Sequence, residues 1–137
     1  MPEQGRIDIA AKRRLHRAVT ASVGWVQLDG GDWAVHLSGP FPETAGIGHD
    51  AFEALREARR LPEAEGWKLG INGARLDVWP SGMARDQGSG LRAYVFPGLP
   101  ARPTELVDVF EACDPSLVGS VAQQLDSIHR LSGVRFA

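Results

Sequence analysis

The chain has 137 residues, of which 43% are hydrophobic and 23% are charged, and this balance is typical of one globular domain and excludes a two-domain, disordered or fibrous protein. Fifteen Lys and Arg against seventeen Asp and Glu give a net charge of −2, so no overall basic field draws the chain to nucleic acid. A single cysteine excludes an internal disulfide framework, and no apolar run is long enough to span a membrane, so we expect a cytoplasmic protein without a membrane partner.

The first predicted element is a basic helix over residues 8–22. Its apolar residues recur at steps of three and four and form one narrow stripe, while Lys and Arg crowd the remaining surface. Residues 1–22 hold five cations and two acids, whereas residues 23–137 hold ten cations and fifteen acids. We therefore expect a single domain over 1–137, with a basic helical segment over 1–22 and an acidic body over 23–137.

A β-hairpin is predicted over residues 24–38, because two apolar runs flank an Asp-Gly-Gly-Asp segment in which glycine supplies the positive φ of a tight turn. Residues 39–48 are rich in Pro and Gly and are expected to be irregular. Asp50 then has the position of a helix N-cap, with Glu53 completing a capping box, and Pro62 limits the helix that follows.

The centre of the chain contains the strongest turn signal. Asn72 and Gly73 separate two runs of alternating apolar residues, so residues 67–79 are predicted to form a second hairpin. Side chains alternate between the two faces of a strand. The second strand of this hairpin is therefore expected to present on one face Arg75, Asp77 and Trp79.

A long loop is predicted over residues 80–90, followed by a strand over 91–96. The alternation in residues 105–110 favours another strand, although a short helix fits this segment almost as well. Asp114 is the predicted cap of a last helix that ends at Gly133. Hairpins that alternate with isolated helices indicate an α+β fold, with a mainly antiparallel sheet of about six strands and two or three helices packed on it.

Residue patterns that support catalysis or metal binding do not occur in the sequence. The four histidines have no partner at ligand spacing, and no serine occupies a nucleophile elbow. Cys113 has no neighbouring cation that would lower the pKa of its thiol. We therefore predict no catalytic residue, no metal site and no cofactor, and the sequence favours binding over enzymatic activity.

The glycine-rich loop over 80–90 is the main candidate for binding, because it is long for a strand connection and Trp, Met and Arg near it are enriched at interfaces. Arg85 could pair with an anion held by the loop, and the polar face of the neighbouring strands could extend the surface. An ordinary connection and a solvated sheet face explain the same residues without any function. The candidate binding residues are Arg75, Asp77, Trp79, Ser81, Met83, Arg85, Asp86, Arg92 and Tyr94.

Residues 66–96 also contain a recognisable spacing, W-x-L-x-x-x-G-A-R-x-D-V-x-P-S-x-M, followed by a glycine-rich turn and an A-Y-V strand. The residues at these positions are Trp67, Leu69, Gly73, Ala74, Arg75, Asp77, Val78, Pro80, Ser81 and Met83, then Gly88, Gly90, Ala93, Tyr94 and Val95. The pattern resembles a family of small uncharacterised bacterial α+β proteins. Members of that family have no established enzyme activity and occur near toxin loci, so the resemblance implies an immunity-like binding role.

Three functions are consistent with these observations. The first is a non-catalytic protein-binding domain, such as an immunity or antitoxin protein that neutralises a bacterial toxin, because an acidic body attracts a basic partner. The second is a small-molecule-binding protein or small enzyme that uses the loop over 80–90. The third is an accessory subunit of a larger assembly that docks through the basic helix over 8–22. A protein partner is expected in the first and third, and a nucleic-acid partner is disfavoured by the net charge.

Overall fold

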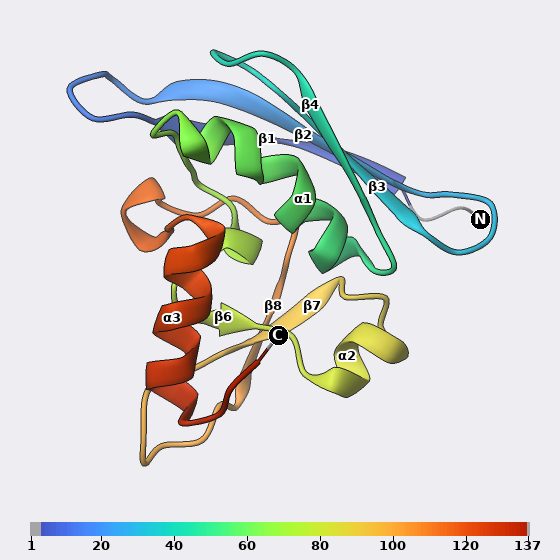
Figure 1. The fold of residues 1–137 in the computed structure, drawn as a ribbon, viewed down its shortest axis with the longest axis vertical. Helices are drawn as coiled ribbons and strands as arrows, with labels where there is room; N and C mark the ends of the chain where they lie inside the picture. The colour runs from blue at the N-terminus through green and yellow to red at the C-terminus, as the bar shows by residue number, and fades with distance from the viewer. Residues whose placement is uncertain (1–3, 137) are drawn as a thin grey trace.

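The computed structural model describes residues 4–136, which form eight β-strands and three α-helices (Figure 1). The strands make two antiparallel sheets, so the fold is α+β, as the sequence predicts. The expected single sheet is corrected to one sheet of five strands and one of three, and the expected number of strands is too low.

The larger sheet has the strand order β4-β3-β2-β1-β5, and each neighbouring pair is antiparallel. Its strands are β1 (Gln4–Lys12), β2 (Val19–Gln27), β3 (Trp33–Ser38), β4 (Thr44–Gly48) and β5 (Lys68–Leu69). The smaller sheet has the order β6-β7-β8 and is also antiparallel. Its strands are β6 (Val78–Trp79), β7 (Arg92–Val95) and β8 (Glu105–Asp108).

Helix α1 covers one face of the larger sheet, whereas α2 and α3 lie beside the smaller sheet. Helix α1 packs against β3 and β4, while α3 contacts both α1 and β6 (Figure 1). The apolar core lies between α1 and the larger sheet and continues into the smaller sheet. The helices are α1 (Ala51–Ala64), α2 (Gly82–Asp86) and α3 (Val121–Ser132), and two 3₁₀ turns are η1 (Asn72–Ala74) and η2 (Pro115–Leu117).

The predicted basic helix over residues 8–22 is wrong, because these residues belong to the hairpin of β1 and β2. Ile9 and Ala11 alternate with more exposed residues and are buried, and Ile9 faces Ala21 across the two strands. Burial at every second residue stabilises a strand with one covered face rather than a helix. The cations of the expected helix therefore gather in the turn between β1 and β2, and residues 1–3 of the expected basic segment lie outside the described residues.

The expected irregular segment over residues 39–48 contains a strand, β4, at its end. Its glycines permit this strand to lie directly beneath α1. A Cβ atom at Gly46 would lie 2.3 Å from the backbone nitrogen of Ala58, and one at Gly48 would lie 2.6 Å from that of Ala54. Glycine in a strand commonly marks such a close backbone approach, and here the neighbour is a helix.

The hairpin predicted at Asn72 and Gly73 is also wrong. These two residues form the buried turn η1, and β5 on one side pairs with β1 while β6 on the other side pairs with β7. Gly73 lies against the core, where a Cβ atom would be 2.5 Å from the Leu55 side chain. The segment therefore connects the two sheets instead of reversing the chain within one of them.

Several predicted boundaries are confirmed. Strands β2 and β3 form the expected first hairpin, and the side chain of Asp50 caps α1 by accepting from the N–H of Glu53 at 2.8 Å. The last helix ends at Gly133 with φ of 71°. Its predicted beginning is corrected, because Asp114 caps only η2 and a capping box at Ser120 begins α3.

A buried hydrogen-bond network joins α1, α3 and the segment before the smaller sheet. Arg59 is fully buried; its Nη1 donates to Glu63 Oε2 at 2.5 Å, and its Nη2 donates to Oε1 of Gln124. Burial lowers the pKa of Arg59 and raises that of Glu63, and the opposite charge of each partner counteracts the shift. Nε2 of Gln124 donates to carbonyl oxygens of Gly73, Arg75 and Val78.

Candidate functional site

A groove lies between α2 and one face of the smaller sheet. It encloses about 470 Å³, and most of its lining is apolar. It opens to solvent, because the side chains on its two walls include Met83, which is 69% exposed, and Leu106, which is 40% exposed. Its lining residues are Ser81, Met83, Ala84, Gln87, Gly88, Leu91, Arg92, Tyr94 and Leu106.

Helix α2 forms one wall of the groove; a side-chain cap stabilises its beginning, and ion pairs near its other end attach it to α1. Oγ of Ser81 accepts a hydrogen bond from the N–H of Ala84 at 3.0 Å and caps the helix. Near its other end, Arg85 donates to Asp50 Oδ2 at 2.9 Å and to Glu53 Oε2 at 3.1 Å. Because both carboxylates lie at the beginning of α1, the groove wall is fastened to the largest helix of the core.

Strands β7 and β8 form the opposite wall. Arg92 and Tyr94 share one face of β7, and their partners across the ladder are Asp108 and Leu106. Nε of Arg92 lies 3.5 Å from Oδ1 of Asp108, and both side chains are exposed. This wall is therefore apolar at Leu106 and charged at the Arg92–Asp108 pair.

Four of the nine predicted binding residues line this groove: Ser81, Met83, Arg92 and Tyr94. They come from the segment over 80–90 and from the polar face of the next strand, which the sequence treats as two separate candidates. The prediction of a loop over residues 80–90 is corrected, because a short helix with an N-cap forms within this segment. That turn moves Met83 to the groove while it directs Arg85 towards α1.

The other five predicted residues do not line the groove. Trp79 is 2% exposed and packs in the core, so its expected role as a contact residue is wrong. Arg75 and Asp77 form a bidentate ion pair with both distances at 2.9 Å, which raises the pKa of Arg75. This pair follows η1 and does not lie on a strand face. Asp86 is exposed on α2, and Arg85 forms an ion pair with Asp50 at the beginning of α1.

Five residues that line the groove were not predicted from the sequence: Ala84, Gln87, Gly88, Leu91 and Leu106. The first three follow from α2, which the Ser81 cap could have indicated. Leu106 carries no local signal, because only the pairing of β7 with β8 brings it opposite Tyr94.

The groove presents a mainly apolar surface with one charged pair on its strand wall. Burial raises the pKa of the half-buried Cys113 thiol to about 11, so little thiolate is present at neutral pH. Within residues 4–136, no group of three or more His, Cys, Asp or Glu side chains is arranged to hold a metal ion. The residues that line the groove include no Asp, Glu, His or Cys side chain.

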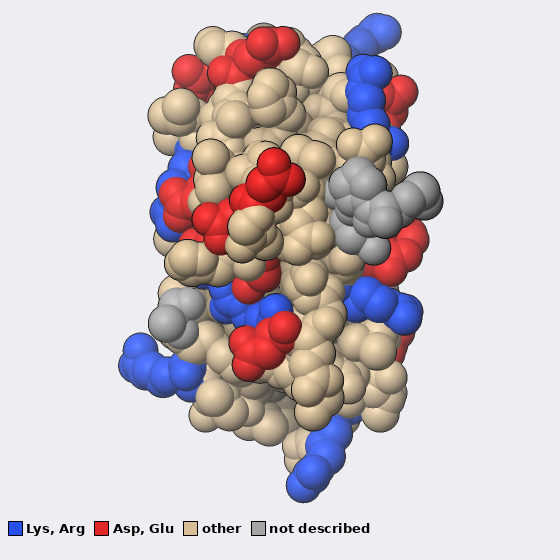
Figure 2. All heavy atoms as spheres, turned by 90° about the vertical axis from the view of Figure 1, so that its right-hand side faces the viewer, with Lys and Arg blue, Asp and Glu red and all other residues tan. Residues whose placement is uncertain are grey.

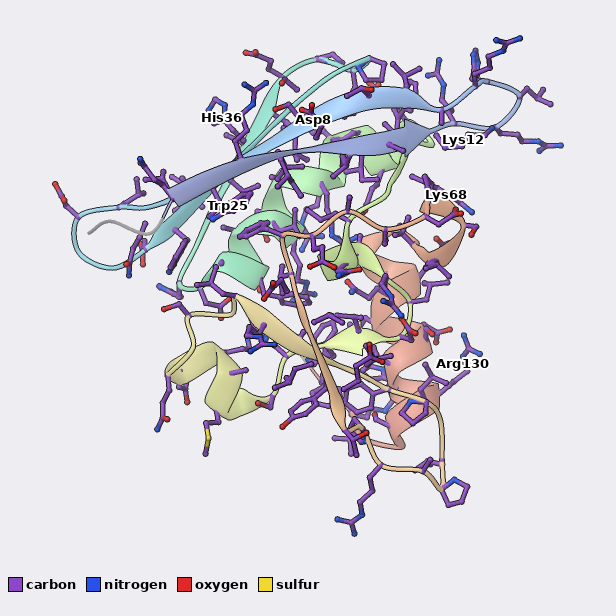
Figure 3. All side chains as sticks on the ribbon, turned by 180° about the vertical axis from the view of Figure 1, so that it is seen from behind. Asp8, Lys12, Trp25, His36, Lys68 and Arg130 are labelled. Atoms are coloured by element: carbon purple, nitrogen blue, oxygen red, sulfur yellow. The ribbon has the colours of Figure 1, made fainter. Side chains whose placement is uncertain are left out.

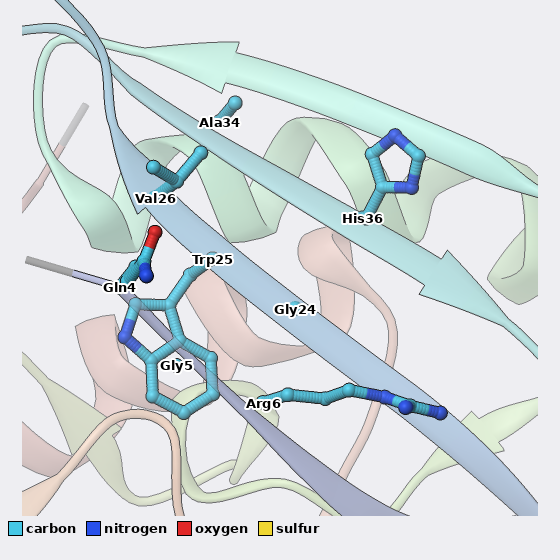
Figure 4. A pocket seen from close by; sticks show the side chains of 8 residues that line it. All are labelled: Gln4, Gly5, Arg6, Gly24, Trp25, Val26, Ala34 and His36. Carbon is cyan, nitrogen blue, oxygen red and sulfur yellow. The ribbon is translucent and has the colours of Figure 1, made fainter.

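A second hollow, of about 550 Å³, lies on the face of the larger sheet that α1 leaves open (Figures 3 and 4). Gly24 lies between Arg6 and His36, its partners on the neighbouring strands. Nε of Arg6 already donates to Oγ of Ser22 at 2.6 Å. Figure 4 shows the Arg6 and His36 side chains well apart, so they do not converge on one ligand group.

Among the helices of the described residues, we find none with the length and apolar character that a membrane crossing requires. Comparison of the sequence with protein-family models and with curated proteins gives no match. The resemblance of residues 66–96 therefore stays an expectation. Several residues of that pattern have structural roles, because they are buried in the core: Trp67, Leu69, Ala74 and Val78.

Proposed function

We propose that this chain is a non-catalytic protein-binding domain that docks a partner protein through the groove between α2 and the smaller sheet. The observation that carries the proposal is the exposure of Met83 and Leu106 on opposite walls of one apolar groove. Burying an exposed Met or Leu side chain contributes about 1.5–3 kcal/mol, and well-packed apolar pockets supply much of the affinity at the centre of interfaces.

The proposed occupant is an apolar side chain presented by the partner. The Arg92–Asp108 pair at the edge of the groove supplies one group of each charge for the polar rim of such an interface. A partner that covers this exposed pair removes water from both charges. The pair therefore favours partners that offer matching charges and penalises those that do not.

The finer proposal is an immunity or antitoxin role, in which the partner is a toxin domain. It is supported by the excess of acidic residues over positions 23–137, which hold ten cations and fifteen acids. Figure 2 shows acidic side chains over the middle of the face that carries α2 and the β2–β3 turn. Acidic charge of this kind accelerates association with a basic surface.

A test compares two double variants with matched exposure. Met83→Ser with Leu106→Ser removes the two groove side chains, which are 69% and 40% exposed, and Leu61→Ser with Leu117→Ser removes two others that are 69% and 45% exposed. Partners are captured by cross-linking to the wild-type chain and identified by mass, and the affinity of each variant is then measured by calorimetry. Co-expression with a captured toxin tests neutralisation by growth.

The proposal predicts that the groove variant loses at least about tenfold in affinity, since two apolar side chains leave the interface, while the control variant binds like wild type. Equal binding by both variants would contradict it. A toxin partner whose effect on growth is unchanged by co-expression would refute the immunity role alone.

A small-molecule ligand is the second candidate, and the groove volume favours it because ligand sites commonly span roughly 300–1,000 Å³. A thermal-shift screen distinguishes the two functions. A ligand that stabilises the wild type and the Leu61/Leu117 control but not the Met83/Leu106 variant supports this candidate.

A further inference from the structure

The turn between β1 and β2 carries the densest positive charge of the described residues. Lys12, Arg13, Arg14 and Arg17 lie within six positions, and Lys12 faces Lys68 across the β1–β5 pair. Within residues 4–136, none of these five cations takes part in an ion pair. We call residues 12–17 the basic turn. Figures 1 and 3 show it projecting beyond the end of α1.

The basic turn is internally organised. Nζ of Lys12 donates to the carbonyl oxygens of Arg13 and His16, and the N–H of His16 donates to Arg13 O at 3.0 Å. The Arg13 guanidinium lies 4.6 Å from the centre of the Trp67 ring, which attaches the turn to the body. These contacts leave Arg14 and Arg17 exposed and available to a partner.

Leu15 lies at the apex of this turn and is 92% exposed. Its φ of 66° falls in the left-handed region, which is unfavourable for leucine and which Gly or Asn adopts more readily. An apolar side chain is thus held fully in solvent, in an unfavourable conformation and among cations. Strain of this kind is common where a residue is positioned for recognition.

A hollow of about 500 Å³ adjoins the basic turn at its base. Lys12 and Lys68 line one side of it, and Ser116 of η2 lies in the same lining. The one acid in the lining, Asp114, already accepts from the N–H of Ser116 at 2.8 Å. This hydrogen bond lowers the pKa of Asp114, so the hollow holds two cations and one carboxylate, and Lys68 extends the cationic surface from the turn onto the body.

We propose that the basic turn docks an acidic segment of a partner protein, with carboxylates on Arg14, Arg17 and Lys68 and an apolar side chain against Leu15. Guanidinium groups bind carboxylates with directed, charge-assisted hydrogen bonds. A peptide that mixes acidic and apolar residues matches both features of the turn.

Other polyanions match the turn less well. Nucleic acid offers phosphates but no apolar counterpart for Leu15, and the basic turn has no Phe, Tyr or Trp side chain on which bases could stack. An anionic membrane offers both features, yet a single leucine buries too little apolar surface to anchor the turn. The proposal is independent of the groove beside α2, since the two surfaces share no residue.

The test measures the binding of full-length protein to labelled probes at low salt by fluorescence anisotropy. The probes are a Glu-rich peptide containing Leu, the same peptide with Ser in place of Leu, and a short DNA duplex; phosphatidylglycerol vesicles are tested by co-sedimentation. Arg14→Glu with Arg17→Glu reverses the charge of the turn. Arg102→Glu with Arg135→Glu makes the same change of net charge at exposed cations elsewhere.

We expect the turn variant to bind the Leu-containing peptide at least about tenfold more weakly than wild type, and the control variant to bind like wild type. Leu15→Asn should weaken binding of the Leu peptide by about tenfold and leave the Ser peptide unaffected. Its melting temperature should equal or exceed that of wild type, because Asn tolerates the left-handed conformation.

Three results would overturn the proposal: equal loss of binding in the two charge-reversal variants, equal affinity of the wild type for the Leu and Ser peptides, or tighter binding to the duplex or to the vesicles than to the Leu peptide. The Met83→Ser, Leu106→Ser variant should bind the Leu peptide like wild type. That comparison separates a failure at the basic turn from a failure at the groove.

Discussion

Arg85 offers a sharp test of how the candidate groove is built. In the structure it holds α2 against α1 through Asp50 and Glu53, and its guanidinium does not face the groove. The Arg85→Ala substitution should therefore release α2 from α1. The cap of α1 should survive, because Asp50 keeps the hydrogen bond from the N–H of Glu53 through its other oxygen.

The expected magnitude follows from burial. The Arg85 side chain is 26% exposed and the Asp50 side chain is 9% exposed, so the pair is neither fully buried nor free in solvent. Hydrogen bonds to charged groups contribute about 1.5–3 kcal/mol and exposed ion pairs about 0–1 kcal/mol. We therefore expect Arg85→Ala to lower the free energy of unfolding by roughly 1–3 kcal/mol, which corresponds to a fall in melting temperature of about 3–10 °C.

The assay pairs thermal unfolding with amide hydrogen exchange over residues 81–90. The matched control is Arg92→Ala, which breaks an exposed ion pair with an N–O distance of 3.5 Å and should cost at most about 1 kcal/mol. Arg85→Ala should also accelerate exchange in α2, whereas Arg92→Ala should not. If the two variants have the same melting temperature and the same exchange in α2, Arg85 does not hold the groove wall.

Two further predictions concern the buried groups. Gln124→Ala should lower the free energy of unfolding by at least about 3 kcal/mol, because two buried carbonyl oxygens, one partly buried carbonyl oxygen and an Arg59 N–H lose their partner. A loss below about 1 kcal/mol in urea denaturation would count against the network. Cys113 should react with iodoacetamide at pH 8 about a hundredfold more slowly in the folded chain than in the urea-unfolded chain, because burial raises its pKa from 9.0 to about 11. Since the folded pKa is the higher one, this thiol should destabilise the fold only as pH rises above 9.0. The alkylation rates are measured by mass spectrometry. Equal rates in the folded and unfolded chains would contradict the raised pKa of Cys113.

The sequence predicts the elements that local interactions stabilise. Helix α1 begins at Asp50 because that side chain satisfies an amide of its first turn, and α3 ends where Gly133 adopts a positive φ. The β2–β3 hairpin forms at an Asp-Gly-Gly-Asp turn, in which both glycines have the positive φ that a tight turn requires. In each case the decisive contact lies within a few residues of the signal.

The elements that the sequence mispredicts depend on distant contacts. The helical spacing in residues 8–22 is accidental, since a turn interrupts it, whereas the burial of Ile9 and Ala11 depends on pairing with β2 and on the core beneath the sheet. Asn72 and Gly73 carry a strong hairpin signal, but a hairpin requires its two strands to pair with each other. Here each strand finds a longer partner in a different sheet.

The residues of the candidate groove also divide into those that local sequence patterns predict and those that only distant contacts bring together. Ser81 and Met83 are predicted because they lie in one glycine-rich segment, and Tyr94 is predicted because it shares a strand face with Arg92. Leu106 joins them only through the ladder between β7 and β8. Trp79 is of an interface-enriched type as well, yet its packing in the core removes it from the surface.

Hydrogen exchange, measured on the chain alone and in complex with its captured partner, tests directly whether the groove beside α2 is the binding surface. We expect slower exchange on binding in residues 81–94 and 105–108, which form the two walls of the groove. Protection confined to the open face of the larger sheet, in residues 20–26 and 34–38, would contradict it.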